Sequence, residues 1–387
     1  MPTLDLQPII GALKTVLADA KSPVALHEPC FSGNEWAYVK DCLDSGWVSS
    51  VGKYVEKFEK LLAEFIGIRR AVAVVNGTAA LYLCLNLVGV AQGDEILLPA
   101  LTFVATANAV TYCGAIPHFA DSEERTLGLD PQKLSAYLNR IAEVRKNACI
   151  NKKTGRRIKA VVPMHTFGHP VDLEPLVELC LQYKLELIED AAESLGSFYK
   201  GKHTGNWGKV SVLSFNGNKT ITTGGGGAIL TNDEKLGDLA KHLTTTARIP
   251  HKWNIQHDQV GFNYRLPNLN ASLGCAQLEQ LPGFLKKKRD LSERYTKAFE
   301  LISGVRFFTE PDFAKSNYWL NALLLEDRYS NQLHELLEMT NNLGFMTRPA
   351  WTLMHKLPMF QDSPRMDLSM CENLEKRIIN LPSSATL

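Results

Sequence analysis

Short apolar segments alternate with longer helix-compatible segments through the first two thirds of this chain. The apolar segments are short enough to be buried strands, and they cover residues 71–75, 95–98, 116–119, 160–164, 185–188 and 210–213. Helix candidates stand between them, at residues 78–87, 103–113 and 173–184. Apolar strands that alternate with helices are typical of a mostly parallel sheet covered on both faces. The sequence therefore predicts an α/β domain.

The alternation ends near residue 280, where a charged helical stretch over residues 285–301 replaces it. Beyond that stretch, residues 318–326 have the apolar pattern of a strand and residues 331–343 that of a helix. We therefore expect a large domain over residues 31–280 and a smaller α+β domain over residues 281–387.

The charge balance of the chain excludes some classes of protein. Its 387 residues include 42 basic and 41 acidic side chains, which gives a net charge of +1. That balance does not support nucleic-acid binding or membrane-surface binding as the main role. No apolar stretch approaches the roughly 20 residues that span a bilayer. Because the start, Met1–Leu6, also lacks the basic and apolar segments of a secretory signal, we expect a cytoplasmic protein.

The eight cysteines are scattered along the chain and form no C-x-x-C pair. Metal-binding cysteines usually recur at short fixed spacings, and disulfide frameworks belong mostly to small secreted domains. Most of these cysteines have apolar neighbours in the sequence, as buried free thiols do. We therefore predict no metal site and no disulfide framework.

The segment Asn76-Gly77-Thr78-Ala79-Ala80 follows a predicted strand and opens a predicted helix. Small residues at such a junction leave backbone N–H groups free, and the helix dipole attracts an anion there, although the same pattern also serves for capping alone. Two other phosphate motifs are disfavoured, because no P-loop pattern occurs and the glycine run Gly224–Gly227 precedes a strand-like segment rather than a helix. Gly77, Thr78 and Ala79 are therefore our candidate phosphate-binding residues.

A lysine and an acidic residue follow predicted strands further along. Lys219 lies in Ser214-Phe215-Asn216-Gly217-Asn218-Lys219, and Asp190 ends an apolar segment that begins at Leu185. Pyridoxal 5'-phosphate (PLP) needs both groups, since a lysine amine bonds to its aldehyde and a carboxylate keeps its pyridine nitrogen protonated. Ser214 carries a hydroxyl that can reach the cofactor phosphate. Taken alone, the lysine fits a surface turn equally well, and the acid fits a helix N-terminus.

Phe103 starts the predicted helix after the strand that ends near Pro99. An aromatic ring at the carboxyl end of a parallel strand can stack on a flat ring in the crevice where such folds bind ligands. A phenylalanine of the core is the other interpretation. Along the chain, the turn that can bind phosphate comes first, followed by the aromatic residue that can stack, the acid for the ring nitrogen, the serine for the phosphate, and the lysine. Each of them lies at or soon after the end of a predicted strand. This order predicts a PLP site in the crevice.

A run of basic residues over 145–157 flanks the turn Thr154-Gly155, between a predicted helix and a predicted strand. Most such runs are solvated loops. Because Arg and Lys suit phosphate oxygens, a contact with a substrate diphosphate is the alternative.

These motifs, with others, resemble those of the DegT/DnrJ/EryC1/StrS family of sugar-nucleotide aminotransferases. The resemblance covers nearly the whole chain, and its motifs are residues 76–81, 189–193, 214–219, 222–227 and 261–268. It implies an aspartate-aminotransferase-type fold (fold type I), in which the large domain has a mostly parallel seven-stranded sheet and the C-terminal domain is a smaller α+β unit. An N-terminal arm over residues 1–30 is expected to pack on the small domain.

The resemblance also implies roles for single residues around the catalytic pair Lys219 and Asp190. Thr78 and Ala79 would bind the cofactor phosphate, Phe103 would stack on the ring, and Glu193 would lie near the ring hydroxyl. A glutamate at that position must be protonated or face a cation, because it would otherwise repel a phenolate. The family implies a homodimer with shared active sites, in which Asn263, or the adjacent Arg265, would reach the partner's phosphate. The candidate substrate contacts are Ser50, Tyr318, Arg348 and His355.

Transamination is the reaction that the resemblance implies, because Lys219 is present where the family's deoxysugar dehydratases have histidine. Residues 27–29, 46–55, 163–170 and 243–247 are most similar to the branch that aminates nucleotide-linked 4-keto-6-deoxy sugars for legionaminic-type nonulosonic acids. We therefore expect amino transfer from L-glutamate to C4 of a UDP-linked 4-keto-6-deoxy-N-acetyl sugar, in bacterial glycan biosynthesis. The alternatives are a 3-keto-sugar aminotransferase, a PLP-dependent dehydratase and a non-catalytic PLP-binding regulator.

Overall fold

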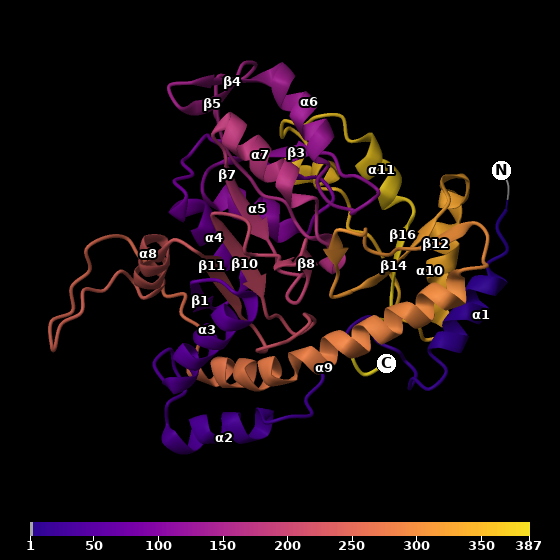
Figure 1. The fold of residues 1–387 in the computed structure, drawn as a ribbon, viewed down its shortest axis with the longest axis horizontal. Helices are drawn as coiled ribbons and strands as arrows, with labels where there is room; N and C mark the ends of the chain where they lie inside the picture. Colours follow the sequence, from indigo (N-terminus) through magenta and orange to yellow (C-terminus); the bar gives the residue numbers. More distant parts are fainter. Residues whose placement is uncertain (1–2) are drawn as a thin grey trace.

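The computed structural model describes residues 3–387, and a nine-stranded sheet lies at its centre (Figure 1). Its main path has the spatial order β1 (Arg70–Val74), β11 (Gly227–Thr231), β10 (Val210–Ser214), β7 (Glu186–Asp190), β6 (Arg157–Val161), β2 (Glu95–Pro99) and β3 (Ile116–Ala120). Strand β11 is antiparallel to both β1 and β10, whereas all neighbours from β10 to β3 are parallel. The predicted α/β fold with a mostly parallel sheet is confirmed.

Helices cover both faces of this sheet. Side chains of a strand alternate between faces, so Val72 and Val74 of β1 join one apolar cluster while Ala71 and Ala73 join another. The helices on the first face are α4 (Gly77–Leu87), α5 (Val104–Tyr112) and α8 (Glu234–Thr244). The helices on the second face are α3 (Lys53–Ile66), α6 (Pro131–Ile141), α7 (Leu173–Tyr183) and the first half of α9 (Asn268–Phe299).

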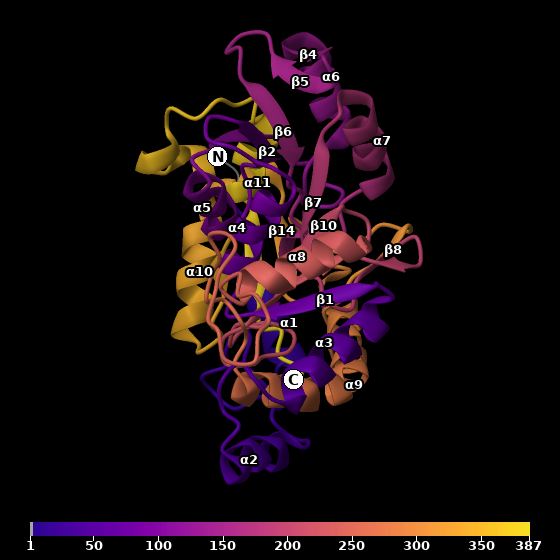
Figure 2. The same cartoon turned by 90° about the vertical axis from the view of Figure 1, so that its left-hand side faces the viewer.

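The basic stretch belongs to a hairpin rather than to the predicted loop. Strands β4 (Ala142–Arg145) and β5 (Ala148–Asn151) extend the sheet beside β6, and Figure 2 shows them projecting from one end of the molecule with α6. Arg157 Nε donates to Asp94 at 2.8 Å, and the Thr154 hydroxyl donates to Glu95 at 2.6 Å. Glu95 starts β2 and Arg157 starts β6, so these contacts lie at the amino ends of the strands. Ligands of such sheets bind at the carboxyl ends, which argues against a diphosphate contact here within one subunit.

Helix α9 runs without a break from the large domain to the C-terminal region (Figure 1). The charged pattern of the sequence predicted a helix only over residues 285–301. Proline lacks the backbone donor and usually ends a helix. Pro282 nevertheless lies inside α9. Leu281 and Phe284 beside it are buried in the core, so tertiary packing holds the helix together through the proline.

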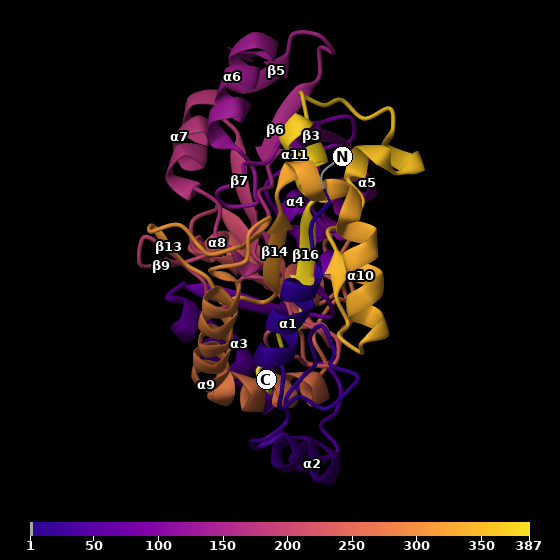
Figure 3. The ribbon, with the colours of Figure 1, turned by 90° about the vertical axis from the view of Figure 1, so that its right-hand side faces the viewer.

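The C-terminal region contains a second sheet, which is antiparallel (Figure 3). Its spatial order is β12 (Val305–Phe307), β14 (Asn321–Leu325), β16 (Ile378–Leu381) and β15 (Arg348–Pro349). Helices α1 (Gln7–Val16) and α10 (Leu333–Asn342) and the end of α9 pack on one face. Residues of the other face, Ala322, Leu324 and Ile378, join the apolar cluster of the large domain. The two sheets therefore share one continuous core.

The N-terminal residues lie beside this second sheet, with α1 packed on α9 (Figure 3). Met1 and Pro2 of the expected arm lie outside the described residues. The elements not yet named are α2 (Glu35–Ser45), α11 (Ser369–Glu375) and the small sheet of β8 (Phe198–Tyr199), β9 (Lys202–His203) and β13 (Ala314–Lys315). Within residues 3–387, none of the helices combines the length and apolar character that crossing a bilayer requires.

Candidate active site

A cavity of about 320 Å³ opens at the carboxyl ends of the parallel strands. Most of the cofactor residues predicted from the sequence line it: Gly77, Thr78, Phe103, Asp190, Glu193, Ser214 and Lys219. They come from four separate segments, each of which follows or ends a strand of the large sheet. The remaining lining side chains include Met164, Asn216, Asn218, Trp319 and Trp351.

One end of the cavity is an anion cradle at the start of α4. Asn76 caps this helix, and its side-chain oxygen accepts the Ala79 N–H at 2.8 Å. The N–H groups of Gly77 and Thr78 in the first turn have no acceptor within the helix, so they are available to an anion. A Cβ atom at Gly77 would lie 3.3 Å from the Ser214 hydroxyl oxygen, which puts that hydroxyl beside the helix terminus. A Cβ at Gly227 would lie 2.7 Å from Gly77 N, so only glycine lets β11 pass so close.

Asp190 ends β7 in the floor of the cavity and is buried. The Thr106 hydroxyl donates to Asp190 Oδ2 at 2.7 Å, and the Ala192 N–H donates to Oδ1 at 3.2 Å. Burial raises the pKa of this carboxyl above its usual range, although these donors and the charge of Lys219 oppose that rise. A carboxylate fixed in this way is suited to pair with a positively charged ring nitrogen.

Lys219 points into the cavity and pairs with Glu193. Its Nζ lies 3.2 Å from Glu193 Oε1 and 3.9 Å from the centre of the Trp319 ring. Burial raises the pKa of Glu193 to about 7, with the nearby charge of Lys219 acting against that rise. Glu193 thus faces a cation. From the sequence, a glutamate at this position was required either to be protonated or to face a cation, and the second condition is met.

Aromatic side chains form the wall of the cavity towards the small domain. Phe103 is the N-cap residue of α5 and half-exposed, and its ring is 6.3 Å from that of Trp351. Trp351 also packs on Phe167, with ring centres 4.9 Å apart. The Trp319 indole N–H donates to the Asn218 carbonyl at 2.7 Å, which ties the small domain to the loop that carries Lys219.

Trp319 was not among the predicted site residues, whereas its neighbour Tyr318 was. Tyr318 has a left-handed backbone (φ 48°), and its buried hydroxyl bonds to the carboxylate of Glu310. This turn sends consecutive side chains in different directions, so Trp319 lines the cavity and Tyr318 packs in the small-domain core. The turn itself was not readable from the pattern of apolar residues.

The other predicted residues do not line this cavity in the part of the chain that the structure describes. Ala79 stands one residue further along α4. Asn263 is exposed and forms a backbone bridge with Thr245. Arg348 is exposed and donates to Asn341, and His355 lies 3.3 Å from Glu372. Ser50 belongs to the loop between α2 and α3.

Comparison with known proteins identifies the family of this chain. The profile of the DegT/DnrJ/EryC1/StrS aminotransferase family matches residues 29–387. The chain belongs to this family. GDP-perosamine synthase of Escherichia coli O157:H7 is 37% identical over 364 residues, which cover 94% of each protein. The putative pyridoxal phosphate-dependent aminotransferase EpsN of Bacillus subtilis is 38% identical over 94% of this chain and 92% of its own length.

Solved structures of the family agree with the fold. PseC of Helicobacter pylori, an aminotransferase involved in the biosynthesis of pseudoaminic acid, superimposes with a TM-score of 0.85. It is 26% identical, and the match covers 95% of each chain. This member of the DegT/DnrJ/EryC1/StrS family is thus a PLP-dependent aminotransferase of fold type I.

The chemistry of the cavity fits PLP. When bound, this cofactor supplies an aldehyde that bonds to amines and a ring that withdraws electrons from the bonded carbon. The cavity offers an anion cradle at α4, a buried carboxylate at Asp190, a lysine amine at Lys219 and an aromatic face at Phe103. Among residues 3–387, no cluster of three or more potential metal ligands is found.

Proposed function

We propose that this enzyme moves the amino group of L-glutamate to C4 of a nucleotide-linked 4-keto-6-deoxy sugar. The observation that carries the proposal is the convergence of Lys219 Nζ, the Asp190 carboxylate and the α4 anion cradle on one cavity. The family assignment supports amino transfer, and the curated relatives named GDP-perosamine synthase support a nucleotide sugar as acceptor.

In this proposal each residue has a separate task. The N–H groups of Gly77 and Thr78 and the Ser214 hydroxyl bind the cofactor phosphate, while Phe103 stacks on the ring. Asp190 holds the proton on the ring nitrogen. Lys219 binds the cofactor in the resting enzyme, and its freed amine then moves a proton between the donor α-carbon and the adjacent cofactor carbon. Glu193 lies beside the ring hydroxyl.

The nucleotide is the finer part of the proposal. Three curated relatives between 35% and 37% identical are named GDP-perosamine synthase, so GDP takes precedence over the UDP expected from the sequence. PseC provides the specific reason to keep the N-acetylated, nonulosonic-type acceptor as the second candidate, since that enzyme is involved in the biosynthesis of pseudoaminic acid. Both candidates receive their amine by the same reaction.

A homodimer with shared active sites is also part of the proposal. Figure 1 shows α2 and the extended segment after α8 at the periphery of the ribbon. Large apolar side chains are exposed on both of them and on the loop that follows α2. They include Trp36, Trp47, Val51, Trp253, Ile255 and Val260. A second copy that covers this surface would explain the exposure, and Asn263 ends the same extended segment. The molar mass of the active enzyme, measured by light scattering, tests the homodimer, and the mass of a monomer would contradict it.

A substrate panel tests the reaction. The enzyme, loaded with PLP, is incubated with L-glutamate and GDP- or UDP-linked 4-keto-6-deoxy sugars, with and without an N-acetyl group. The proposal expects an aminated nucleotide sugar by mass spectrometry, with one 2-oxoglutarate formed for each amine. A 3-keto sugar in the panel tests the alternative of a 3-keto-sugar aminotransferase, because that enzyme would aminate this acceptor. A deoxygenated product would indicate the dehydratase, and bound PLP without turnover would indicate a regulator.

A further inference from the structure

Glu193 and Lys219 form an ion pair inside the cavity. Their side chains are only 2% and 13% exposed. Among residues 3–387, Glu193 is the only carboxylate within ion-pair distance of Lys219. The face of Trp319 is the other close neighbour of the amine, and it offers no acceptor atom for a proton. Any proton that leaves Lys219 Nζ within the protein therefore has Glu193 Oε1 as its nearest acceptor.

The pair meets a charge problem when the lysine reacts. A lysine that bonds to an aldehyde as a neutral imine is no longer an ammonium, and a buried carboxylate that loses its cation is strongly disfavoured. The charge of Asp190 adds repulsion, because it acts on Glu193 from the end of β7. Uptake of a proton by Glu193 removes this conflict.

We infer that Glu193 is a catalytic residue, whose Oε1 accepts the proton that Lys219 Nζ releases when the lysine bonds to the cofactor aldehyde. The inference rests on the proposed function. The new bond joins Nζ to the aldehyde carbon, and the aldehyde oxygen leaves as water with two of the three ammonium hydrogens. The third hydrogen passes to Oε1, so no other reactant is needed.

The two oxygens of Glu193 are arranged for this exchange. Oε2 accepts the Phe167 N–H at 2.9 Å, while Oε1 alone faces Lys219. The Asn317 side-chain amide donates to the Glu193 carbonyl at 2.9 Å and fixes the backbone. A proton on Oε1 leaves Oε2 free to keep its bond to Phe167, so the carboxyl gains the proton without turning.

The ionisation of Glu193 suits this role. The charged groups that act on it are Lys219, on the loop after β10, and Asp190. Burial raises the pKa of Glu193 to about 7, so its proton affinity lies near neutrality. At about pH 8 the cofactor-free enzyme holds Glu193 mainly ionised and ready to accept a proton, whereas at about pH 5.5 it is already protonated.

Infrared difference spectra on the full chain, freed of PLP and labelled with ¹³C only at glutamate carboxyls, test the inference. Addition of PLP at about pH 8 is expected to convert one glutamate carboxylate per chain into a protonated carboxyl, and to do so much less at about pH 5.5. Glu193→Gln is expected to lose this signal. Glu59→Gln, which alters another glutamate–lysine pair outside the cavity, is expected to keep it.

The outcomes separate this inference from the proposed function. If the visible band of lysine-bound PLP forms and no glutamate becomes protonated, Glu193 is not the acceptor, and the function stands. If no visible band forms at all, the proposed function is overturned and this inference with it. Should Glu193→Gln fail to fold, the pH comparison on the unmutated chain still decides, because a merely structural glutamate would give no signal at either pH.

Discussion

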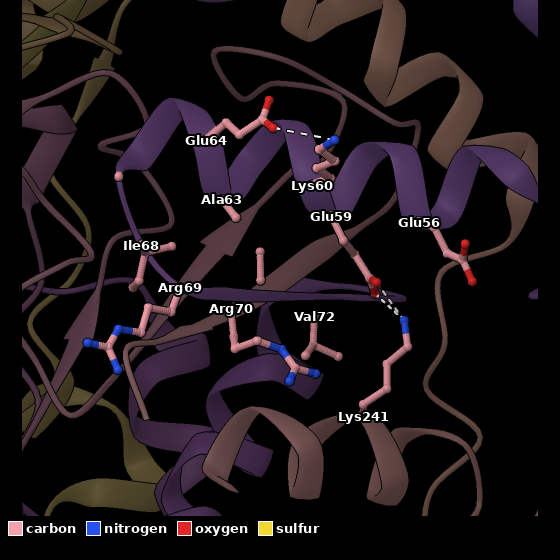
Figure 4. Close-up of a pocket in the computed structure, with 12 residues that line it drawn as sticks. Glu56, Glu59, Lys60, Ala63, Glu64, Ile68, Arg69, Arg70, Val72 and Lys241 are labelled. Carbon is pink, nitrogen blue, oxygen red and sulfur yellow. Dashed lines mark hydrogen bonds and ion pairs between the residues drawn. The ribbon is translucent and has the colours of Figure 1, made fainter. Parts of the chain in front are cut away.

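Two partly buried lysine–glutamate pairs, one in contact with β1 and one in the cavity, are built differently. In the pair outside the cavity, Lys241 Nζ contacts both carboxylate oxygens of Glu59, at 2.7 and 2.5 Å. Figure 4 shows that this pair connects α3, which carries Glu59, to α8, which carries Lys241. Glu59 Oε1 also accepts the Ala73 N–H of β1 at 3.0 Å. In the cavity, Lys219 contacts only one oxygen of Glu193, and at 3.2 Å.

The two pairs also differ in how burial acts on the pKa of Lys241 and on that of Glu193. In the α3–α8 pair burial lowers the pKa of Lys241, although Glu59 opposes that change. In the cavity pair burial raises the pKa of the acid, Glu193, to about 7. A bidentate pair that also caps a strand edge is a structural link. The pair of Lys219 and Glu193 has a single contact, and its acid has a pKa of about 7. Such a pair can separate, as a covalent reaction of the lysine requires.

Replacing each lysine should give the largest contrast. Lys219→Ala is expected to abolish the visible band of bound PLP and to lower kcat by roughly 10³-fold or more, because both the covalent attachment and the proton transfer disappear. Lys241→Met should retain the band and most of the activity. Absorption spectra and 2-oxoglutarate release measure both. Equal losses in the two variants would remove the distinction between the pairs.

Asp190→Asn should have the next largest effect, since it keeps the shape of the side chain and removes the charge. We expect kcat to fall by roughly 10²-fold to 10³-fold, because a neutral amide no longer holds the ring nitrogen protonated. PLP should still bind to Lys219, which spectroscopic titration checks. Thr106→Val, which removes the hydroxyl that donates to Asp190, is the matched milder variant. A kcat unchanged in Asp190→Asn would contradict the assigned role.

The site could be predicted from the sequence wherever a residue lies at or just beyond the end of a strand. Gly77, Asp190 and Ser214 belong to this group, because a parallel sheet brings the carboxyl ends of its strands together whatever the loop lengths. The fold class followed from the same alternation of strands and helices.

Residues whose placement depends on tertiary contacts were not predictable in this way. Trp319 lines the cavity because the left-handed turn at Tyr318 redirects the chain, and no periodic pattern announces such a turn. The continuation of α9 through Pro282 depends on the burial of Leu281 and Phe284, which single-residue propensities do not contain. The pairing of Glu193 with Lys219 joins residues 26 positions apart and became visible only in the fold.

The pH dependence of stability sharpens the comparison of the two pairs. Glu193 has its folded pKa raised from 4.5 to about 7, so the unfolded chain loses this proton first as pH rises. Its contribution is fully present below about pH 4.5 and is lost as pH rises through about 7, a change on the order of 3 kcal/mol. We expect the free energy of unfolding of the PLP-free enzyme, measured in urea, to fall more across this window than that of Glu193→Gln. Parallel curves for the two proteins would show that Glu193 titrates normally.

Glu59→Gln should give the smallest effect and completes the comparison. The amide keeps an acceptor for the Ala73 N–H but removes the charge that balances Lys241. The two side chains are 13% and 28% exposed, so solvent takes over part of the interaction, and we expect the free energy of unfolding to fall by about 1.5 kcal/mol. The visible band of bound PLP and kcat should stay within about twofold of the unmutated enzyme, because this pair lies outside the cavity. A large loss of kcat with unchanged stability would reverse the roles assigned to the two pairs, since the link between α3 and α8 would then serve the reaction rather than the fold.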